Sequence, residues 1–266
     1  MGSIAYGVSK DQSDVDVYGW CIPPKRYVFP HTEGYLPGFS KNIPSFEQWF
    51  QHHIKRSNNK EYDVTVYSIV KYFRLCMDNN PNMIDSLFVP ARCILHISSI
   101  GSMVRSERTL FLHKGSFHKF RGYLWSQLNK AKKIGAVGKR KKDIDRLGYC
   151  PKFLYHVVRL ASELEQILRE GTLVLDEKGR REHMKAIRDE IIGYDEVVKW
   201  FEEKDRILQK LYETSSLPHS PPEDKIKDLL LRCLEEHYGN IDSCVIQSDK
   251  YKVCIDKVRD ILNEVL

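Results

Sequence analysis

A Gly-Ser pair at residues 2 and 3 is followed, after ten further residues, by Asp14-Val15-Asp16. The run SDVDVYG alternates polar and apolar residues with a period of two, which predicts a β-strand with Asp14 and Asp16 on one face. Two carboxylates on one face can share a divalent cation. Gly2-Ser3 is expected in a loop that leads into a helix, where backbone N–H groups are available to phosphate oxygens. A phosphate-binding loop beside a carboxylate-bearing strand is the minimal apparatus for phosphoryl or nucleotidyl transfer.

The chain resembles the nucleotidyltransferase superfamily typified by DNA polymerase beta, in which Gly-Ser precedes Asp-x-Asp at this spacing. Within that superfamily it is similar to a bacterial and phage branch described as predicted nucleotidyltransferases. The resemblance runs from residue 2 to about residue 235. Its ordered pieces are GSIAYG, SDVDVYG, Pro23-Pro24, DVTVYSIVKYFRL, NPNMIDSLFVP, LFLHKGSFHKFRGYLWSQL, GYCPKFLYHVVRL and ETSSLP. Relatives carry a strand or helix upstream of the motif, so either this chain begins late or its fold manages without that element.

The bulk composition is that of an ordinary soluble protein, with 42% hydrophobic and 29% charged residues. No apolar run approaches the roughly 20 residues that span a bilayer, and no signal-peptide pattern opens the chain. The seven cysteines are scattered and include no CxxC pair. We therefore expect reduced thiols in a cytoplasmic protein, without a zinc knuckle or a disulfide framework. His52 and His53 also lack partners at metal-ligand spacing and are interpreted as loop or surface residues.

The pattern of apolar residues changes near residues 97–108. Before this point SDVDVYGWCI and DVTVY are typical of strands, and residues 31–62 are expected to form a long loop with one short helix around SFEQWFQHHI. After it, apolar residues recur three and four apart almost throughout, which is typical of helices. We predict an α+β fold: a small mixed-sheet nucleotidyltransferase domain, residues 1–105, followed by an all-helical domain, residues 106–266, that closes the nucleotide cleft. An amphipathic stretch within residues 240–266 is expected to cap the helical part.

Superfamily members usually add a third carboxylate from a neighbouring strand, and the resemblance assigns this role to Asp63 at the start of DVTVY. Glu61 is the alternative, because the pattern does not fix the register of the strand. The resemblance implies that Asp14, Asp16 and Asp63 are the catalytic residues and bind two Mg²⁺ ions. The implied reaction is in-line attack of an acceptor hydroxyl on the α-phosphate of a nucleoside triphosphate, with release of pyrophosphate.

Residues for binding the nucleotide are expected at both ends of the resemblance. Gly2 and Ser3 are predicted to bind its terminal phosphates. Lys152, His156 and Arg159 are four and three residues apart, so they form one stripe of a helix. This stripe is either the solvated side of an amphipathic helix or, as the resemblance implies, a surface that binds the triphosphate.

The net charge of +6 is unevenly spread, because residues 130–152 alone hold nine Lys or Arg and only two Asp. Such a run often makes only a solvated loop. Next to a nucleotidyltransferase core, we expect it to recruit a polyanionic acceptor, RNA in the first place, because cations lower the electrostatic cost of binding phosphates. The candidate contacts are Lys139, Arg140, Lys141 and Lys142.

Three functions fit these residues. The first is Mg²⁺-dependent transfer of a nucleoside monophosphate to an RNA end, in RNA repair or tRNA modification. The second is nucleotidylation of a protein or a small molecule by the same site. The third is a non-catalytic RNA-binding protein that uses residues 130–152, and the retained Asp14, Asp16 and Asp63 argue against it. The motif encodes neither the acceptor nor the preferred base, so it does not separate the first two.

Overall fold

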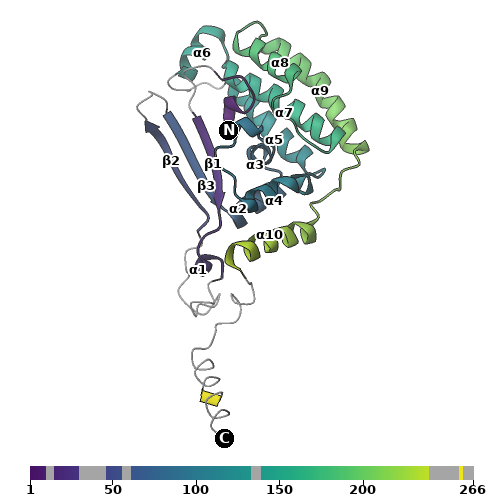
Figure 1. Ribbon diagram of the computed structural model, residues 1–266. Helices are drawn as coiled ribbons and strands as arrows, with labels where there is room; N and C mark the ends of the chain where they lie inside the picture. Colours follow the sequence, from purple (N-terminus) through teal and green to yellow (C-terminus); the bar gives the residue numbers. More distant parts are fainter. Residues whose placement is uncertain (10–14, 30–45, 56–60, 133–138, 240–257, 260–266) are drawn as a thin grey trace, which may run out of the picture.

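The computed structural model describes residues 1–9, 15–29, 46–55, 61–132, 139–239 and 258–259, and the account below is confined to them. It confirms the α+β fold. A three-stranded mixed sheet forms one side of the molecule and helices form the rest (Figure 1). The N-terminus lies where the sheet and the helices meet.

The sheet consists of β1 (Val15–Cys21), β2 (Gln48–Lys55) and β3 (Glu61–Ser68), in the order β1-β3-β2. β1 pairs with β3 in parallel, and β2 pairs with β3 in antiparallel. The predicted short helix around SFEQWFQHHI is therefore wrong, because most of this run forms β2. Aromatic and β-branched side chains suit a pleated strand, and pairing with β3 satisfies backbone groups that a lone strand would leave open.

Two helices follow β3, and the first of them packs against β3 and β1. The hydroxyl of Ser68 caps α2 (Ile69–Met77), and the side chain of Asn80 caps α3 (Pro81–Phe88). Trp20 of β1 stacks on Tyr72 of α2, with ring centroids 5.8 Å apart. The face of β1 that carries Trp20 is therefore the face that meets the helices.

The rest of the described chain is almost entirely helical, as the sequence predicts. The long helix α7 (Pro151–Glu170) packs against α5 (Ser116–Ala131), α8 (Lys178–Arg188) and α9 (Tyr194–Thr214). Proline in its first turn and Gly171 in a left-handed conformation just past its end set its bounds. The other helical elements are η1 (Gly2–Ile4), α1 (Lys25–Val28), η3 (Ala91–Cys93), α4 (Ser99–Ser106), η4 (Arg108–Phe111), α6 (Lys139–Leu147) and α10 (Glu223–Tyr238).

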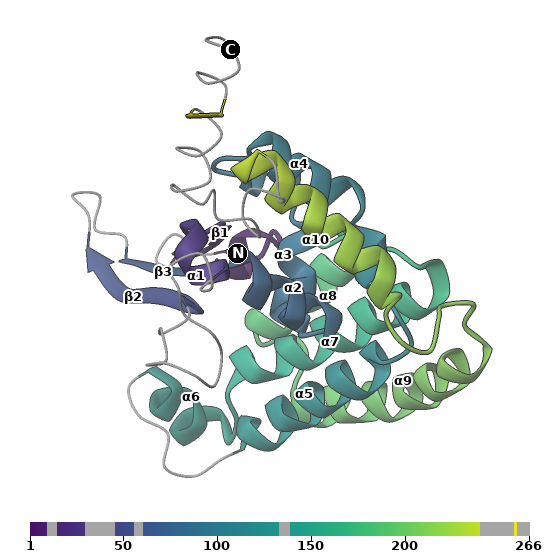
Figure 2. The same ribbon diagram turned by 90° about the horizontal axis from the view of Figure 1, so that it is seen from below.

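One hydrophobic core spans the predicted boundary at residue 105. It includes Tyr6 from the N-terminal segment, Phe73 from α2 and Leu154 from α7. The last long helix, α10, also returns to pack on α4 and α2, as Figure 2 shows from below. Within the described ranges, none of the helices is both long enough and apolar enough to cross a membrane.

Candidate active site

Asp16 and Asp63 lie side by side on neighbouring strands. The parallel register of β1 and β3 pairs Asp16 with Asp63 directly, and paired residues project to the same face of a sheet. Strand alternation places Tyr18 and Trp20 on this face as well, so the two carboxylates are on the face that meets the helices. Glu61 lies on the same face at the beginning of β3, two residues before Asp63. The predicted ligand Asp14 lies outside the described residues.

Gly2 lies directly against the carboxylate of Asp16. The protonated N-terminus donates a hydrogen bond of 2.6 Å to the backbone oxygen of Asp16. Gly2 has a φ of +63°, and a Cβ at this position would lie only 2.3 Å from Asp16 Oδ2. Both the left-handed backbone and this close approach require glycine. The loop predicted to lead into a helix is the single 3₁₀ turn Gly2–Ile4, and it touches the carboxylate strand as the motif implies.

A β-bulge in the edge strand β2 lies opposite Asp63. Gln51 pairs with Val64 and Ile54 with Tyr62, so two histidines on β2 oppose the single residue Asp63. Bulges bend a strand and redirect its side chains, and they are frequent beside active sites.

The bulged histidines both contact the acidic residues of β3. His53, with a φ of 55°, donates its backbone N–H to Asp63 Oδ1 at 2.9 Å. His52 Nδ1 lies 3.4 Å from the same oxygen, and His53 Nδ1 lies 3.3 Å from Glu61 Oε2. His52 and His53 are exposed, as expected of surface residues, but they belong to β2 and lie beside the site, which no motif in the chain marks.

Of two cavities in the described structure, one lies along β1 and the other lies between helices. The first, of about 490 Å³, runs along β1 from Met1 and Asp16 to Trp20, and residues 92–98 form part of its other wall. The second, of about 500 Å³, lies between the start of α3 and the helix α5. Asp16 itself lines the first cavity, so a ligand there has direct access to its carboxylate.

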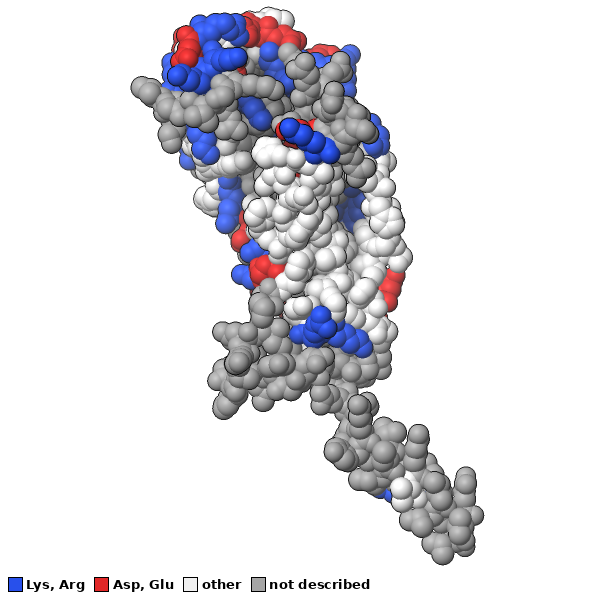
Figure 3. All heavy atoms as spheres, turned by 90° about the vertical axis from the view of Figure 1, so that its left-hand side faces the viewer, with Lys and Arg blue, Asp and Glu red and all other residues white. Residues whose placement is uncertain are grey.

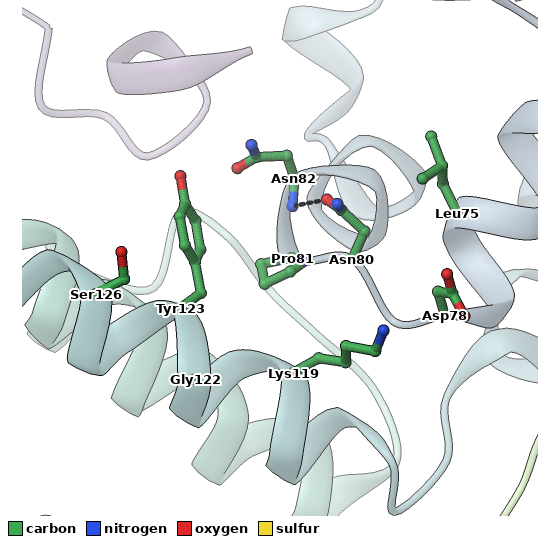
Figure 4. Close-up of a pocket in the computed structure, with 9 residues that line it drawn as sticks. All are labelled: Leu75, Asp78, Asn80, Pro81, Asn82, Lys119, Gly122, Tyr123 and Ser126. Carbon is green, nitrogen blue, oxygen red and sulfur yellow. Dashed lines mark hydrogen bonds between the residues drawn. The ribbon is translucent and has the colours of Figure 1, made fainter.

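The second cavity is lined by polar groups from both helices. In Figure 4, Asn82 and Tyr123 extend in the same direction, and Lys119 extends toward Asp78. Burial, and next the charge of Asp16, raises the pKa of Tyr18 to about 12, and Tyr123 contributes in the same direction. The charge of Asp16 and the hydroxyl of Tyr123, which lines the second cavity, therefore both act on Tyr18.

Comparison with known protein families agrees with this geometry. The family model described as RlaP, the RNA repair pathway DNA polymerase beta family, matches residues 1–230. The chain belongs to this family. Searches of the curated proteins and of the solved structures found no match. As an RlaP-family protein, the chain has the fold of a polymerase beta superfamily nucleotidyltransferase, and the family's name connects it with RNA repair.

The acidic residues of this RlaP-family protein suit a hard divalent cation. Asp16 and Asp63 offer carboxylate oxygens, which Mg²⁺ prefers, and Gly2 leaves room beside Asp16 that a side chain would fill. No group of three or more His, Cys, Asp or Glu poised to hold a metal occurs in the part of the chain that the structure describes. The third carboxylate expected from the motif, Asp14, falls outside that part.

Arg159 lies in a buried network, away from solvent. Its side chain is only 2% exposed and pairs with Asp85 and, at 3.3 Å, with Glu163. It also donates a hydrogen bond of 2.8 Å to the hydroxyl of Tyr6, which in turn donates to Asp85 Oδ2 at 2.6 Å. Burial lowers the pKa of Arg159, but Glu163, Tyr6 and Asp85 overcome this effect and hold that pKa well above its ordinary value. This placement argues against the predicted contact of Arg159 with a nucleotide.

The other cations predicted at the site lie nearer the surface. Lys152 is exposed and His156 half-buried in the first turns of α7. Between them, Tyr155 is close enough to Asp16 to feel its charge. Burial raises the pKa of Tyr155. The positive charges of Arg188 and Arg159 offset part of this rise, and the negative charge of Asp16 adds to it.

In the basic segment, α6 begins at Lys139. Lys141 and Lys142 are exposed, and the side chains of Lys139 and Arg140 lie outside the described part.

Proposed function

We propose that this chain is an Mg²⁺-dependent nucleotidyltransferase that transfers a nucleoside monophosphate from a nucleoside triphosphate to the hydroxyl of an RNA end. The direct pairing of Asp16 with Asp63 beside the close approach of Gly2 carries this proposal. Gly2 and Asp16, one residue from each half of the motif, lie against each other, and Asp63 pairs with Asp16 on the same face of the sheet. RNA repair in the family's name supports an RNA acceptor.

The carboxylates of Asp16 and Asp63, together with Asp14, would hold the metal. Bound there, Mg²⁺ would neutralise phosphate charge and lower the pKa of the acceptor hydroxyl. The hydroxyl oxygen bonds to the α-phosphorus, the bond from that phosphorus to the bridging oxygen of the β-phosphate breaks, and pyrophosphate leaves. The hydroxyl proton goes to solvent. Catalysis then comes from positioning and charge neutralisation, so the site needs no nucleophilic side chain.

The nucleotide is proposed to lie along β1. Gly2 and Ser3 would bind its terminal phosphates, because their turn touches Asp16. The cavity of about 490 Å³ that Asp16 lines would take the nucleoside, since its volume falls in the usual range for small-molecule sites. Lys152 would add positive charge from the start of α7, and His156 would offer a ring N–H to a phosphate oxygen. Tyr155 lies between them in the sequence, and the charge of Asp16 contributes to its raised pKa. Arg159 would support this arrangement from the core.

The basic segment is proposed to guide the RNA acceptor. Lys141 and Lys142 are exposed on α6, which precedes α7 directly. Cations that face solvent attract a phosphate backbone without reading its sequence. A protein or a small molecule is the alternative acceptor, and the experiment below separates these cases.

The test uses Asp16→Asn with Asp228→Asn as a matched control, because Asp228 is an exposed acid on α10. Each labelled nucleoside triphosphate is incubated with RNA carrying a free 3′ hydroxyl, with total protein, or with neither, with and without Mg²⁺. We expect Mg²⁺-dependent labelling of RNA that falls at least about 100-fold in Asp16→Asn, since a lost ligand weakens charge stabilisation worth several kcal/mol. Asp228→Asn should label RNA like the wild type. Full turnover by Asp16→Asn would overturn the assignment of the site, and labelling of protein alone would overturn the RNA acceptor.

A further inference from the structure

The edge strand β2 carries exposed rings beside the carboxylates, and two of them, Phe50 and His52, lie next to each other. Phe50 pairs with Thr65 of β3, which pairs with Tyr18 of β1, so Phe50 shares the face of Asp16 and Asp63. Phe50 is 58% exposed and the side chain of His52 is 52% exposed. By contrast, Tyr18 and Trp20 on the same face are partly buried against the core. Burial in the core therefore accounts for the aromatic residues of β1 but not for Phe50.

The two rings form a row that ends at Asp63. The ring centroids of Phe50 and His52 are 5.4 Å apart, and the bulge brings His52 Nδ1 to 3.4 Å from Asp63 Oδ1. We call Phe50 and His52 the β2 platform. Proteins stack the bases of single-stranded nucleic acid on exposed aromatic rings of this kind, including those of Phe and His.

The order of the strands decides which substrate the platform meets. Gly2 touches Asp16 on β1, whereas the platform lies on β2, and β3 with Asp63 separates them. In an in-line displacement the attacking and leaving oxygens are on opposite sides of the phosphorus. If the phosphate loop binds the leaving pyrophosphate on the β1 side, the attacking hydroxyl approaches from the side of Asp63 and β2.

The charge around the platform also suits a polyanion. β2 contains no acidic residue and ends at Lys55. Figure 3 views the molecule from the side that carries the sheet; most of the described surface there is uncharged, and residues of both charges lie mainly toward its ends and margins. β2 therefore adds no negative charge of its own to that of the neighbouring Asp63 and Glu61, which lowers the electrostatic cost of bringing a phosphate backbone to it.

We infer that the β2 platform stacks the terminal bases of a single-stranded RNA acceptor and so places its end hydroxyl beside Asp63. This inference rests on the proposed function, because it concerns the acceptor of the same reaction. It assigns Phe50 a positioning role, with stacking that does not depend on the identity of the base.

Phe50→Ala tests this inference, and Trp49→Ala is its matched control. Trp49 is the next residue of the same strand, is 47% exposed, and projects to the opposite face. We expect Phe50→Ala to raise the KM for a single-stranded acceptor about 5-fold to 150-fold, the range for loss of one stacked base. The Kd for the nucleoside triphosphate should stay unchanged, and Trp49→Ala should match the wild type in both. Phe50→Leu, which keeps an apolar side chain but removes the ring, should behave like Phe50→Ala, and Phe50→Trp should restore the acceptor KM.

An acceptor with abasic terminal nucleotides identifies stacking specifically. On this RNA, wild type and Phe50→Ala should have the same acceptor KM, because the base that the ring would stack is missing. Melting curves establish that each variant is folded. Equal KM values for Phe50→Ala and Trp49→Ala on intact RNA would overturn the platform while leaving the proposed function in place, and so would a difference that persists on abasic RNA. Failure of the proposed function itself would appear earlier, as a wild-type protein that labels no RNA.

Discussion

Replacement of Gly2 with alanine should slow nucleotidyl transfer far more than its effect on the stability of the fold explains. The new Cβ would lie 2.3 Å from Asp16 Oδ2, whereas ordinary contact begins at 3.4 Å. The carboxylate or the turn must therefore move by about 1 Å. A misplacement of that size in a reacting geometry costs roughly 100-fold in rate. The alanine must also adopt a left-handed φ of +63°, which costs about 1–2 kcal/mol of stability.

Gly148→Ala separates the two effects. Gly148 has a φ of +79° and no atom within 4 Å of an added Cβ, so alanine there meets the backbone strain without the clash. Both variants should lose about 1–2 kcal/mol, which corresponds to roughly 2–8 °C in Tm for a chain of this size. Only Gly2→Ala should also lose about 100-fold in transfer rate.

The assay is single-turnover labelling of RNA at saturating nucleotide, with Tm measured on the same preparations. Equal transfer rates for the two variants would refute the reasoning, since both would then act through backbone strain alone. A Gly2→Ala protein that melts far below Gly148→Ala would show that the turn supports the fold rather than the carboxylate.

Two further changes test particular groups. Asp63→Asn should lose Mg²⁺-dependent transfer and Glu61→Gln should keep it, because Asp63 is the residue of β3 that pairs with Asp16. If Glu61→Gln is inactive and Asp63→Asn is active, the third ligand is Glu61. Burial raises the pKa of Glu163 from its ordinary 4.5 to about 8, so the folded state keeps a proton that the unfolded state releases between these values. The free energy of unfolding should therefore fall as the pH rises through this window. In Glu163→Gln the fall should be smaller, as measured by urea unfolding at pH 5 and pH 8. An equal fall in the two proteins would contradict the assignment.

The local pattern predicts the strands of the site but not how they pair. SDVDV and DVTVY alternate clearly, so two acid-bearing strands follow from the sequence. The choice between Asp63 and Glu61 depends on register, which the alternation of a single strand cannot show. The sequence predicts a short helix around SFEQWFQHHI within a long loop, and the apolar spacing of Phe46, Trp49 and Phe50, three and four residues, does not exclude it, because short apolar runs fit both periods. The pairing of β2 with β3, a tertiary contact, decides the outcome.

The basic stripe on α7 shows a second limit of pattern reasoning. Helical spacing correctly places Lys152, His156 and Arg159 along one stripe. It does not show that the N-terminal segment covers only the far end of that stripe. Tyr6 contacts Arg159 across 153 residues of sequence. A helical period carries no information about such a distant partner. The spacing alone therefore does not distinguish the buried Arg159 from the exposed Lys152.

This contact ties the motif loop to the helical part of the chain. Tyr6 follows Gly2 by four residues, and its hydroxyl joins Asp85 of α3 to Arg159 of α7. Without α7, the carboxylate of Asp85 would lose its buried cation, and removal of one partner from a buried ion pair costs about 3–5 kcal/mol. The turn at Gly2 is thus held from two sides, by Asp16 of β1 and by the network on α7. We infer that the boundary near residue 105 separates two patterns of secondary structure rather than two units that fold alone, because the geometry of the carboxylate pair depends on both.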